Sequence, residues 1–443
     1  MYDDVPAQSL SAGWGIFCMV DRPKRDRLLM LAPIMPSDRG NGLAMRAGFF
    51  LDAYSRRFDV DLVVAPVSGR GKPSAFVRSR TRRIEILNID RPDSHYTLAA
   101  SVIDPMARVD AFRRYGRPSR TAFIGPVSQS LGELARDIRY KAVHVSRLYL
   151  AELATPWVRN HRGSTRIVLD CDENEALAQR RIAAMERWRH NPIAAAWIDA
   201  EAEAFARFAA EWLPKFDLVF AASNKEAKSL SAFGARAMVV PNVASAGLLR
   251  PRHRRGQFFT IVFVGALGYS PNADAVTWFV SRIWLRLERA LHYRVRLIIV
   301  GSNPSTAITR LGSQRGIEVT GAVTDVAPYY RDADLVIAPL RAGGGTRIKI
   351  IEAAVHGVPV VATGFGAEGT TFQHGVDMLM ANDEATFLRA CLLLARDGSL
   401  SRRLAAQARL KARRDYAPAY WRARVADLVA CRDDACLIAT ASE

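Results

Sequence analysis

The stretch Pro339–Thr363, with the sequence PLRAGGGTRIKIIEAAVHGVPVVAT, decides the fold of this chain. It continues an apolar run, residues 335–339, which predicts a short buried strand. The next residues predict a helix over 347–355 that ends at Gly357, and then a second strand over 358–362. A strand, a glycine-rich loop, a helix and another strand make one unit of an α/β sheet.

The start of this helix is suited to binding an anion. Its loop and cap are Gly343, Gly344, Gly345 and Thr346. Glycines let a ligand approach the backbone N–H groups, and threonine is a good N-cap. Arg347 and Lys349 follow in the expected first turn. Cations there are unfavourable to the helix dipole, so we expect an external negative group to be the reason for them.

Lys349, Glu352 and His356 lie three and four positions apart and therefore share one face of the helix. Cations suit the phosphates of a phosphorylated sugar compound, and a carboxylate suits its hydroxyl groups. The alternative is the solvated face of an ordinary crossover helix. Glycines alone would fit that alternative, whereas glycines together with charges that oppose the dipole favour a binding site. His356 is expected to be structural.

The composition is that of a globular protein with room for two or three domains, since 49% of the 443 residues are apolar and 24% are charged. No apolar run has the length of a membrane-spanning helix. The five cysteines have neither zinc-binding nor redox spacing, which favours a reducing cytoplasm. Residues 1–26 are expected to form a loose leader, because their apolar segment is too short for a signal peptide.

The formal charge of +18 favours anionic partners. Such a partner could be a membrane surface, a phosphorylated substrate or nucleic acid. No nucleic-acid-binding module is recognisable, and basic residues are scattered along the chain. We therefore expect no nucleic acid partner and favour an anionic membrane surface.

The first half of the chain predicts one α/β domain over residues 27–243. It opens with a strand over 27–33, a loop that contains Gly40 and Gly42, and a helix over 43–57. The glycines follow the carboxyl end of the strand, where open α/β sheets bind their ligands. They do not form the G-x-G-x-x-G pattern of dinucleotide-binding proteins.

Two further features complete the predicted organisation. A helical arm over 174–210, broken near Pro192, is inserted into the first domain. After a polar linker, 244–256, a second α/β domain covers 257–415, and residues 416–443 hold a last helix that crosses back to the first domain. The predicted fold class is thus α/β, with two Rossmann-like domains that face each other across a cleft.

The second domain resembles a known enzyme family in three segments, Gly265-Ala-Leu-Gly268, Gly321-Ala-Val323 and Gly343–Gly357. These segments are similar to those of the retaining GT-B glycosyltransferases of glycosyltransferase family 4, within which the chain resembles bacterial polysaccharide-type sugar transferases. The similarity covers about 258–415. In the first domain it is thinner and rests on the Gly40–Gly42 loop and three short segments: 144–149, 170–175, and Ser223 with Glu226 before Pro241-Asn242.

The resemblance implies a donor site in the second domain. Glu352 would hold the ribose hydroxyls of a nucleotide, and Arg347 and Lys349 would take the diphosphate and carry the catalysis. Gly265 and Gly268 would lie beside the phosphates, and Val323 near the base. Gly344 stands where the wider family often has a first glutamate, so the amides of Gly343, Gly344, Gly345 and Thr346 would replace its contacts to the sugar. Ser270, Pro271 and Asn272 stand where an arginine and a lysine are usual.

The resemblance also implies an acceptor side in the first domain, for which Gly40, Gly42, His144, Arg147, Asp170 and Asp172 are candidates. His144 could orient the acceptor or be an ordinary core histidine, and Arg147 could bind an acceptor phosphate. Asp170-Cys-Asp172 is formally a D-x-D pattern, for which we favour an acceptor-side or structural role over metal binding. Trp188, Trp197 and Trp212 on the arm are expected to serve packing more than membrane docking. Tyr420 and Trp421 are expected to pin the last helix.

The implied reaction is transfer of a sugar from a nucleotide-sugar donor, UDP-sugar first, to a glycan or polyprenyl-linked acceptor. The resemblance implies retention of configuration, no metal and no cofactor, and a role in bacterial surface or exopolysaccharide synthesis. It places the protein in the cytoplasm, at the periphery of the inner face of the membrane. Two alternatives remain, a nucleotide-sugar 2-epimerase and a non-catalytic scaffold with the same fold.

Overall fold

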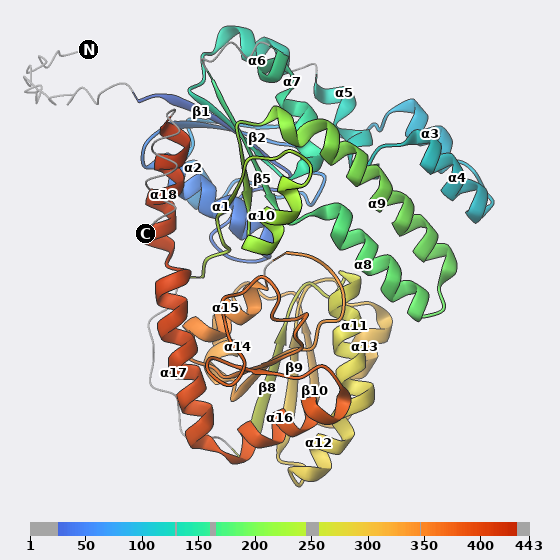
Figure 1. The fold of residues 1–443 in the computed structure, drawn as a ribbon, viewed down its shortest axis with the longest axis vertical. Coiled ribbons are helices and arrows are strands. Elements are labelled where there is room, and N and C mark those ends of the chain that lie inside the picture. Colours follow the sequence, from blue (N-terminus) through green and yellow to red (C-terminus); the bar gives the residue numbers. More distant parts are fainter. Residues whose placement is uncertain (1–24, 129–130, 160–164, 245–256, 346, 432–443) are drawn as a thin grey trace, which may run out of the picture.

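The structure is a computed structural model, and it describes residues 25–128, 131–159, 165–244, 257–345 and 347–431. Figure 1 shows two α/β domains, one above the other, with a helical arm on one side. Thr346, nearly all of the expected leader and nearly all of the expected linker lie outside the described residues.

The N-terminal domain is built on a sheet of seven described strands, all of whose pairings are parallel. In their order across the sheet the strands are β3 (Arg83–Ile86), β2 (Asp59–Val64), β1 (Arg27–Ala32), β4 (Ala142–Ser146), β5 (Arg166–Asp172), β6 (Leu218–Ala221) and β7 (Ala237–Val239). The central strands are buried along almost their whole length, because helices cover both faces of a parallel sheet.

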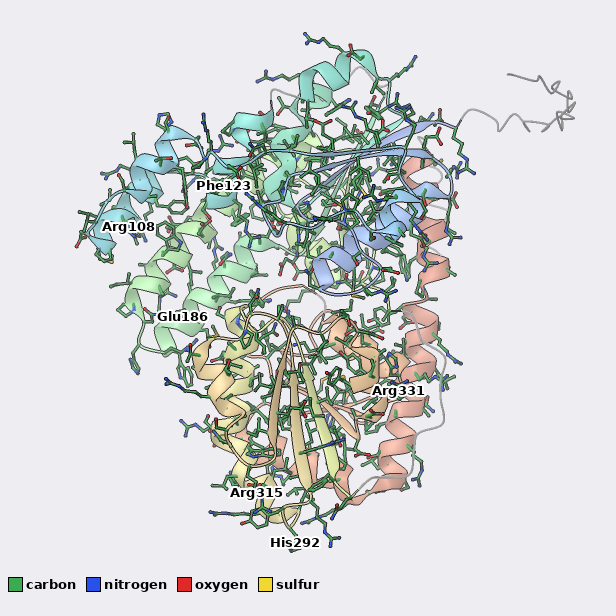
Figure 2. All side chains as sticks on the ribbon, turned by 180° about the vertical axis from the view of Figure 1, so that it is seen from behind. Arg108, Phe123, Glu186, His292, Arg315 and Arg331 are labelled. Carbon is green, nitrogen blue, oxygen red and sulfur yellow. The ribbon has the colours of Figure 1, made fainter. Side chains whose placement is uncertain are left out.

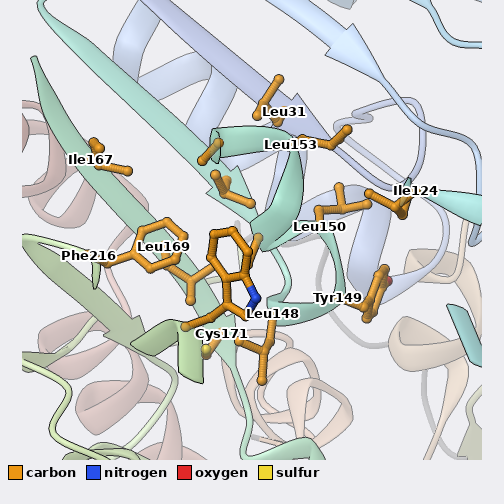
Figure 3. Close-up of a cluster of buried hydrophobic side chains, with 14 of the residues drawn as sticks. Leu31, Ile124, Leu148, Tyr149, Leu150, Leu153, Ile167, Leu169, Cys171 and Phe216 are labelled. Atoms are coloured by element: carbon orange, nitrogen blue, oxygen red, sulfur yellow. The ribbon is translucent and has the colours of Figure 1, made fainter. Parts of the chain in front are cut away.

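The helices of this domain are α1 (Gly42–Ser55), α2 (Ala75–Arg78), α3 (Ser94–Ala100), α4 (Pro105–Tyr115), α5 (Gly125–Ser128), α6 (Leu131–Asp137), α7 (Thr155–Arg159), α8 (Glu175–Trp188), α9 (Pro192–Trp212) and α10 (Asn224–Ser231). Three short 3-10 turns are η1 (Ser119–Phe123), η2 (Leu148–Ala154) and η3 (Leu213–Lys215). Figure 3 shows how η2 seals one face of the sheet, with Leu150 and Leu153 packed near Leu31 and Leu169. All four of these side chains are fully buried.

The inserted arm consists of α8 and α9, and Pro192 is the first residue of α9. Helices α3 and α4, in a span without a clear pattern in the sequence, pack beside it, and the rings of Phe112 and Trp197 stack 4.6 Å apart. Figure 2 shows these four helices on the same side of the molecule, marked by Arg108 on α4 and Glu186 on α8. Trp197 therefore has a packing role, whereas Trp188 is 63% exposed.

The C-terminal domain is built on a second sheet, whose six described strands are also parallel. Their order is β10 (Ile317–Gly321), β9 (Val295–Val300), β8 (Phe259–Val264), β11 (Leu335–Ala338), β12 (Val360–Ala362) and β13 (Leu379–Met380). Two parallel sheets flanked by helices confirm the predicted fold class.

The helices of this domain are α11 (Ser270–Phe279), α12 (Leu285–Ala290), α13 (Thr306–Leu311), α14 (Ala327–Asp332), α15 (Ile348–Val355), α16 (Glu384–Arg396) and α17 (Gly398–Asp415). A π-helical turn, η4 (Val280–Trp284), joins α11 to α12. Helix α11 has Pro271 in its first turn, where a proline is tolerated.

The last described helix, α18 (Pro418–Ala430), lies against the N-terminal domain beside α1 (Figure 1). Its buried residues Val425, Leu428 and Val429 belong to the core cluster of that domain. Arg422 forms an ion pair with Asp52 of α1 at 2.9 Å. Of the two aromatic residues expected to pin this helix, Tyr420 does not, because its side chain is 56% exposed, whereas Trp421 packs against the same core cluster as the aliphatic residues.

We predict that Leu428→Ala lowers the free energy of unfolding by about 2–4 kcal/mol, because the substitution leaves a cavity between α18 and α1. Urea denaturation followed by tryptophan fluorescence measures this change. The control is Tyr420→Ala on the same helix, which should change stability by less than about 0.5 kcal/mol. Equal effects of the two substitutions would mean that α18 is not part of the N-terminal core.

Candidate functional site

The two domains enclose a cavity of about 390 Å³. From the C-terminal domain, residues just after the carboxyl ends of β8, β9, β10 and β11 line it. From the N-terminal domain, the loop after β1 contributes Gly40, Asn41 and Gly42, together with Met45 at the start of α1. The cavity therefore lies at the carboxyl ends of parallel strands, where α/β sheets bind ligands.

A second cavity, of about 230 Å³, adjoins the first. The two share the lining residues Gly40, Met45, Val323, Val326 and Glu352. Pro418 and Arg422 of α18 also line it, so the helix that returns to the N-terminal domain forms part of its wall. His356 lies at this wall and stacks on Tyr330 with ring centroids 5.5 Å apart, which agrees with a structural role.

The glycine loop leads into α15, which begins at Ile348 and not at Arg347 as the sequence predicted. Arg347 is the N-cap residue, with a non-helical backbone (φ −80°, ψ 81°). The physical reason is that its guanidinium turns back and donates a hydrogen bond to the carbonyl oxygen of Gly344. The proposed cap, Thr346, lies outside the described residues. Lys349 remains in the first turn, directed into the cavity.

Lys349 is 7% exposed, and its Nζ donates a hydrogen bond of 2.9 Å to Oδ1 of Asn272. The same amine lies 4.1 Å from the ring centroid of Phe263. A Cβ on Gly265 would lie 2.9 Å from this amine, so the glycine leaves room for it. Burial, assisted by the nearby charge of Arg347, lowers the pKa of Lys349 to about 7.

Glu352 stands one turn further along the helix and lines both cavities. Its Oε2 accepts a hydrogen bond of 2.7 Å from the hydroxyl of Tyr330. Burial raises the pKa of Glu352 to about 7, although the bond from Tyr330 and the charge of Lys349 act in the opposite direction. The carboxyl group is thus held in place and is close to its titration point near neutral pH.

Arg347 is 7% exposed, and its guanidinium lies 5.1 Å from the ring centroid of Phe365. Burial lowers the pKa of Arg347, while Tyr269 and Glu173 partly offset that effect. Its Nε has no hydrogen-bond partner among the described residues. A buried cationic group whose hydrogen bonding is incomplete is costly, and an anion in the cavity would remove that cost.

Five of the predicted donor residues line this one cavity: Gly265, Val323, Arg347, Lys349 and Glu352. The other predicted donor glycines lie beside it. Gly268 packs against Asn303, and the carbonyl oxygen of Gly343 accepts a hydrogen bond of 3.3 Å from Arg181 of the N-terminal domain. Gly344 and Gly345 face Glu173, also of the N-terminal domain.

The acceptor-side candidates divide into two groups. Gly40 and Gly42 line the cavity. His144 is fully buried in the N-terminal core, where its ring nitrogens bond to Tyr54 at 2.9 Å and to Ser146 at 3.1 Å. Burial lowers its pKa to about 3. This placement fits the core-histidine alternative and gives His144 no contact with the cavity.

Asp170 and Asp172 belong to a buried ion-pair network. Asp170 accepts a hydrogen bond of 2.6 Å from Arg46 on α1, and Asp172 pairs with Arg147 at 3.2 Å. Asn242 donates to Asp172 at 3.2 Å. Both carboxylates therefore serve to hold β5, α1 and the start of η2 together, which fits the structural alternative.

Sequence reasoning missed several residues of the site. Tyr269, Asn272 and Ser302 line the cavity, and Glu173, Arg181 and Glu368 connect the domains beside it. In the sequence, Asn272 was only a departure from the family pattern. Its hydrogen bond with Lys349 accounts for an asparagine at this position. Glu173 lies within the 170–175 segment that carries the family resemblance. The others carry no local signal, because their roles arise from contacts between segments far apart in the chain.

An interdomain cluster closes the arm side of the cavity. Glu368 accepts hydrogen bonds from Arg181 at 2.7 Å and from Lys225 at 2.6 Å, both from the N-terminal domain. Burial alone would raise the pKa of Glu368, but the bond from Lys225 and the charge of Arg181 hold it below its usual range. The centroid of the Phe365 ring lies 5.1 Å from the guanidinium groups of both Arg181 and Arg347, so both cations contact the same aromatic ring.

This architecture is the GT-B fold, the fold of glycosyltransferases with two facing α/β domains. Residues 258–397 match the family model described as Glycosyl transferases group 1, and this range lies within the C-terminal domain. The matched range contains Arg347, Lys349 and Glu352. The family match and the fold together support a glycosyltransferase, as the sequence predicted.

Among curated proteins, the chain is 27% identical over 234 residues to a GDP-mannose-dependent alpha-(1-6)-phosphatidylinositol monomannoside mannosyltransferase of Mycobacterium tuberculosis. That match covers 46% of this chain and 58% of the relative. The chain spans between 35% and 58% of the lengths of the curated relatives that it matches first.

Among solved structures, sucrose-phosphate synthase from Thermosynechococcus elongatus has a TM-score of 0.67 and 13% identity, and the match covers 94% of this chain and 100% of that one. Anabaena HepE in complex with UDP-glucose has a TM-score of 0.60 and 15% identity, and the match covers 91% of this chain and 99% of that one. These likenesses establish the fold. Among the described residues, every helix is too short or too polar to span a bilayer.

We predict that Lys349→Met stabilises the ligand-free protein at pH 7 by about 1–3 kcal/mol, because methionine fills the same space without a buried charge. The folded-state pKa of about 7 lies below the ordinary value of 10.5, so the unfolded chain binds more protons between these pH values. The contribution of Lys349 to stability is therefore lowest near and below pH 7 and recovers as pH rises towards 10.5.

Urea unfolding at pH 7 and pH 9 tests this prediction, and the gain from Lys349→Met should shrink at the higher pH. Lys411→Met is the control, because Lys411 is paired with Asp377 at 3.0 Å and its loss should destabilise the protein. Destabilisation by both substitutions would contradict an unfavourably buried Lys349.

We predict that Glu368→Gln loosens the contact between the domains, because glutamine cannot pair with Arg181 and Lys225. Small-angle X-ray scattering should show a larger radius of gyration at pH 7. The parent protein should lose the same contact in acid, because the pKa of Glu368 is lowered in the folded protein. The stabilisation from such a carboxylate is complete above its pKa in the unfolded chain and is lost as the pH falls through its pKa in the folded protein. Glu384→Gln, which alters an exposed pair with Arg282 inside the C-terminal domain, should leave the scattering unchanged.

Proposed function

We propose that this protein transfers a sugar from a nucleotide-sugar donor to a glycan or lipid-linked acceptor. The observation that carries the proposal is the arrangement on α15. Arg347, Lys349 and Glu352 enter one cavity together with the Gly265 loop and Val323, at the carboxyl ends of the strands. Cations for a diphosphate and a carboxylate for ribose hydroxyls match the two polar parts of a nucleoside diphosphate.

In this proposal Arg347 and Lys349 stabilise the negative charge that develops on the departing diphosphate. Each contact of this kind is worth about 3 kcal/mol when it is preorganised in a dry site. Burial lowers the pKa of Lys349 to about 7, and a bound diphosphate would favour its charged form. Tyr330 holds the Glu352 carboxyl group towards the ribose.

We propose that the reaction retains the configuration of the sugar and uses neither metal nor cofactor, as in glycosyltransferase family 4. The acceptor hydroxyl would form its bond to the anomeric carbon on the face from which the diphosphate departs. The bond from that carbon to the phosphate oxygen breaks, and this oxygen takes the hydroxyl proton. Asp170 and Asp172 are each paired with an arginine, so these carboxylates are already engaged. This supports the proposal that Arg347 and Lys349, and not a metal held by carboxylates, bind the diphosphate.

We propose UDP-sugar as the first donor to test, because HepE, a structural neighbour, binds UDP-glucose. GDP-mannose is the second, since the mycobacterial relative depends on it. That relative also acts on a lipid acceptor, which supports a polyprenyl-linked or other lipid-linked acceptor and a role in bacterial surface or exopolysaccharide synthesis.

We further propose that the protein works in the cytoplasm at the periphery of the inner membrane face. Its charge of +18 suits an anionic surface. Near the turn between α3 and α4, Leu98 of α3, Ile103 of the turn and Met106 of α4 are exposed at 69%, 89% and 47%. Apolar side chains of this kind at the tip of a helix pair can enter a lipid interface.

The test is a thermal-shift screen with UDP-, GDP- and ADP-sugars, followed by calorimetry on the best of them. We predict that Glu352→Ala weakens nucleotide binding at least about tenfold without unfolding the protein, because the ribose loses a charged hydrogen-bond acceptor. Arg347→Ala and Lys349→Ala should each lower the rate of transfer or donor hydrolysis about a hundredfold or more.

Glu318→Ala, on the exposed side of β10, is the control and should change neither binding nor turnover. Unchanged nucleotide affinity in Glu352→Ala would remove the ribose assignment. Binding without any turnover in the parent would favour the scaffold alternative, and accumulation of a stereoisomer of the donor would favour the epimerase.

A further inference from the structure

We infer that Glu173, which belongs to the N-terminal domain, is a ligand of the donor sugar and completes the donor site from across the domain boundary. This inference rests on the proposed function. It identifies a specificity-determining residue that the C-terminal motif does not contain.

The glycine loop is shaped around the Glu173 carboxylate. A Cβ on Gly344 would overlap Oε2 of Glu173 and would lie 2.7 Å from the Cβ of Ala178 on α8. A Cβ on Gly345 would lie 3.4 Å from the same oxygen. Any side chain at position 344 would therefore point straight at Glu173, so the carboxylate occupies the space that such a side chain would take.

The position of Glu173 is fixed by its own domain. It follows β5 directly and precedes Asn174, the N-cap of α8. Its Oε1 accepts a hydrogen bond of 3.1 Å from Nη1 of Arg147. Arg147 is held in turn by Asp172 and by the carbonyl oxygen of Cys171, at 3.2 Å and 3.3 Å. The second carboxylate oxygen is the one that faces the glycine loop.

The loop that Glu173 faces lies next to the proposed diphosphate position. Arg347 donates a hydrogen bond to the carbonyl oxygen of Gly344, so the guanidinium and the glycine loop are in direct contact. The sugar is the group attached to the outer phosphate, and it must therefore lie near this loop. Tyr269, which lines the cavity, is a further neighbour, since burial and then the charge of Glu173 raise the pKa of its hydroxyl.

A carboxylate in this position can accept hydrogen bonds from sugar hydroxyl groups. The amides of the glycine loop can only donate, so they cannot perform that part of the recognition. Glu173 supplies the acceptor that Gly344 lacks. Because it comes from the opposite domain, the sugar contacts form only while α8 lies against the loop, a state held by the bond from Arg181 to the Gly343 carbonyl oxygen at 3.3 Å.

The test compares a free nucleotide with its sugar conjugate, using UDP and UDP-glucose or the corresponding pair from the screen. In Glu173→Gln, we expect the affinity for the free nucleotide to stay within about twofold of the parent. Affinity for the sugar conjugate and the rate of its hydrolysis should fall about 10- to 100-fold. Glu173→Asp, which keeps a shorter carboxylate, should recover part of that loss.

Glu186→Gln is the matched control, because it removes a carboxylate from the far end of α8, the helix that follows Glu173, and should leave both affinities unchanged. Gly344→Ala should resemble Glu173→Gln, since its Cβ displaces the carboxylate. Circular dichroism and the unfolding midpoint establish that each variant is folded. If Gly344→Ala does not fold, Glu173→Gln and Glu173→Asp alone test the inference.

Two results would overturn the inference while the proposed function stands. One is an unchanged affinity and rate for the sugar conjugate in Glu173→Gln. The other is an equal loss for the free nucleotide and the conjugate, which would mean that Glu173 only supports the loop. Absence of nucleotide binding in the parent protein is a different result, and it would overturn the proposed function together with this inference.

Discussion

Burial of cationic groups beside uncharged partners is the constraint on which the site depends. Lys349 bonds to an amide oxygen of Asn272, and Arg347 bonds to a backbone carbonyl, so neither cation is neutralised by its direct partner. Such an arrangement is unfavourable on its own and persists because the apolar face of α15, with Ile350 and Ile351 fully enclosed, packs deep in the C-terminal core. Packing of this domain therefore offsets the unfavourable burial of the two cations.

Charges in the N-terminal domain are arranged in the opposite way. Arg46 and Arg147 are paired with Asp170 and Asp172, so the ends of β4 and β5 carry a nearly neutral network. That network fixes the loops that face the cavity, but it leaves little unpaired charge to bind a ligand. The two halves of the cleft therefore have different roles. The C-terminal half carries the cations that would bind an anion, and the N-terminal half fixes the form of the cavity wall. Glu173 is the residue through which the N-terminal network contacts the C-terminal domain.

The fold class could be predicted because both sheets consist of short apolar runs that alternate with helical segments, a local pattern that repeats along the chain. The face shared by Lys349 and Glu352 could be predicted for the same reason, since helix periodicity is local. The exact start of α15 could not, because it depends on the guanidinium of Arg347 turning back onto the loop. Asn272 could not be assigned either, as its partner lies 77 positions away in the chain. Helices α3 and α4 escaped notice because only Ala99, Val109 and Phe112 of their residues are buried, too few to give a periodic signal.

The return of α18 to the first domain has a mechanical consequence. The chain returns from the C-terminal to the N-terminal domain between α17 and α18, and α18 packs into the N-terminal core, so this connection joins the domains along one edge (Figure 1). A connection of this kind limits separation of the domains at that edge and still permits bending about it. The cleft is therefore expected to open by rotation about the edge that carries α17 and α18. The largest displacement would be on the opposite side, where α8 meets the glycine loop (Figure 1). Substrates would then enter and leave by way of the arm.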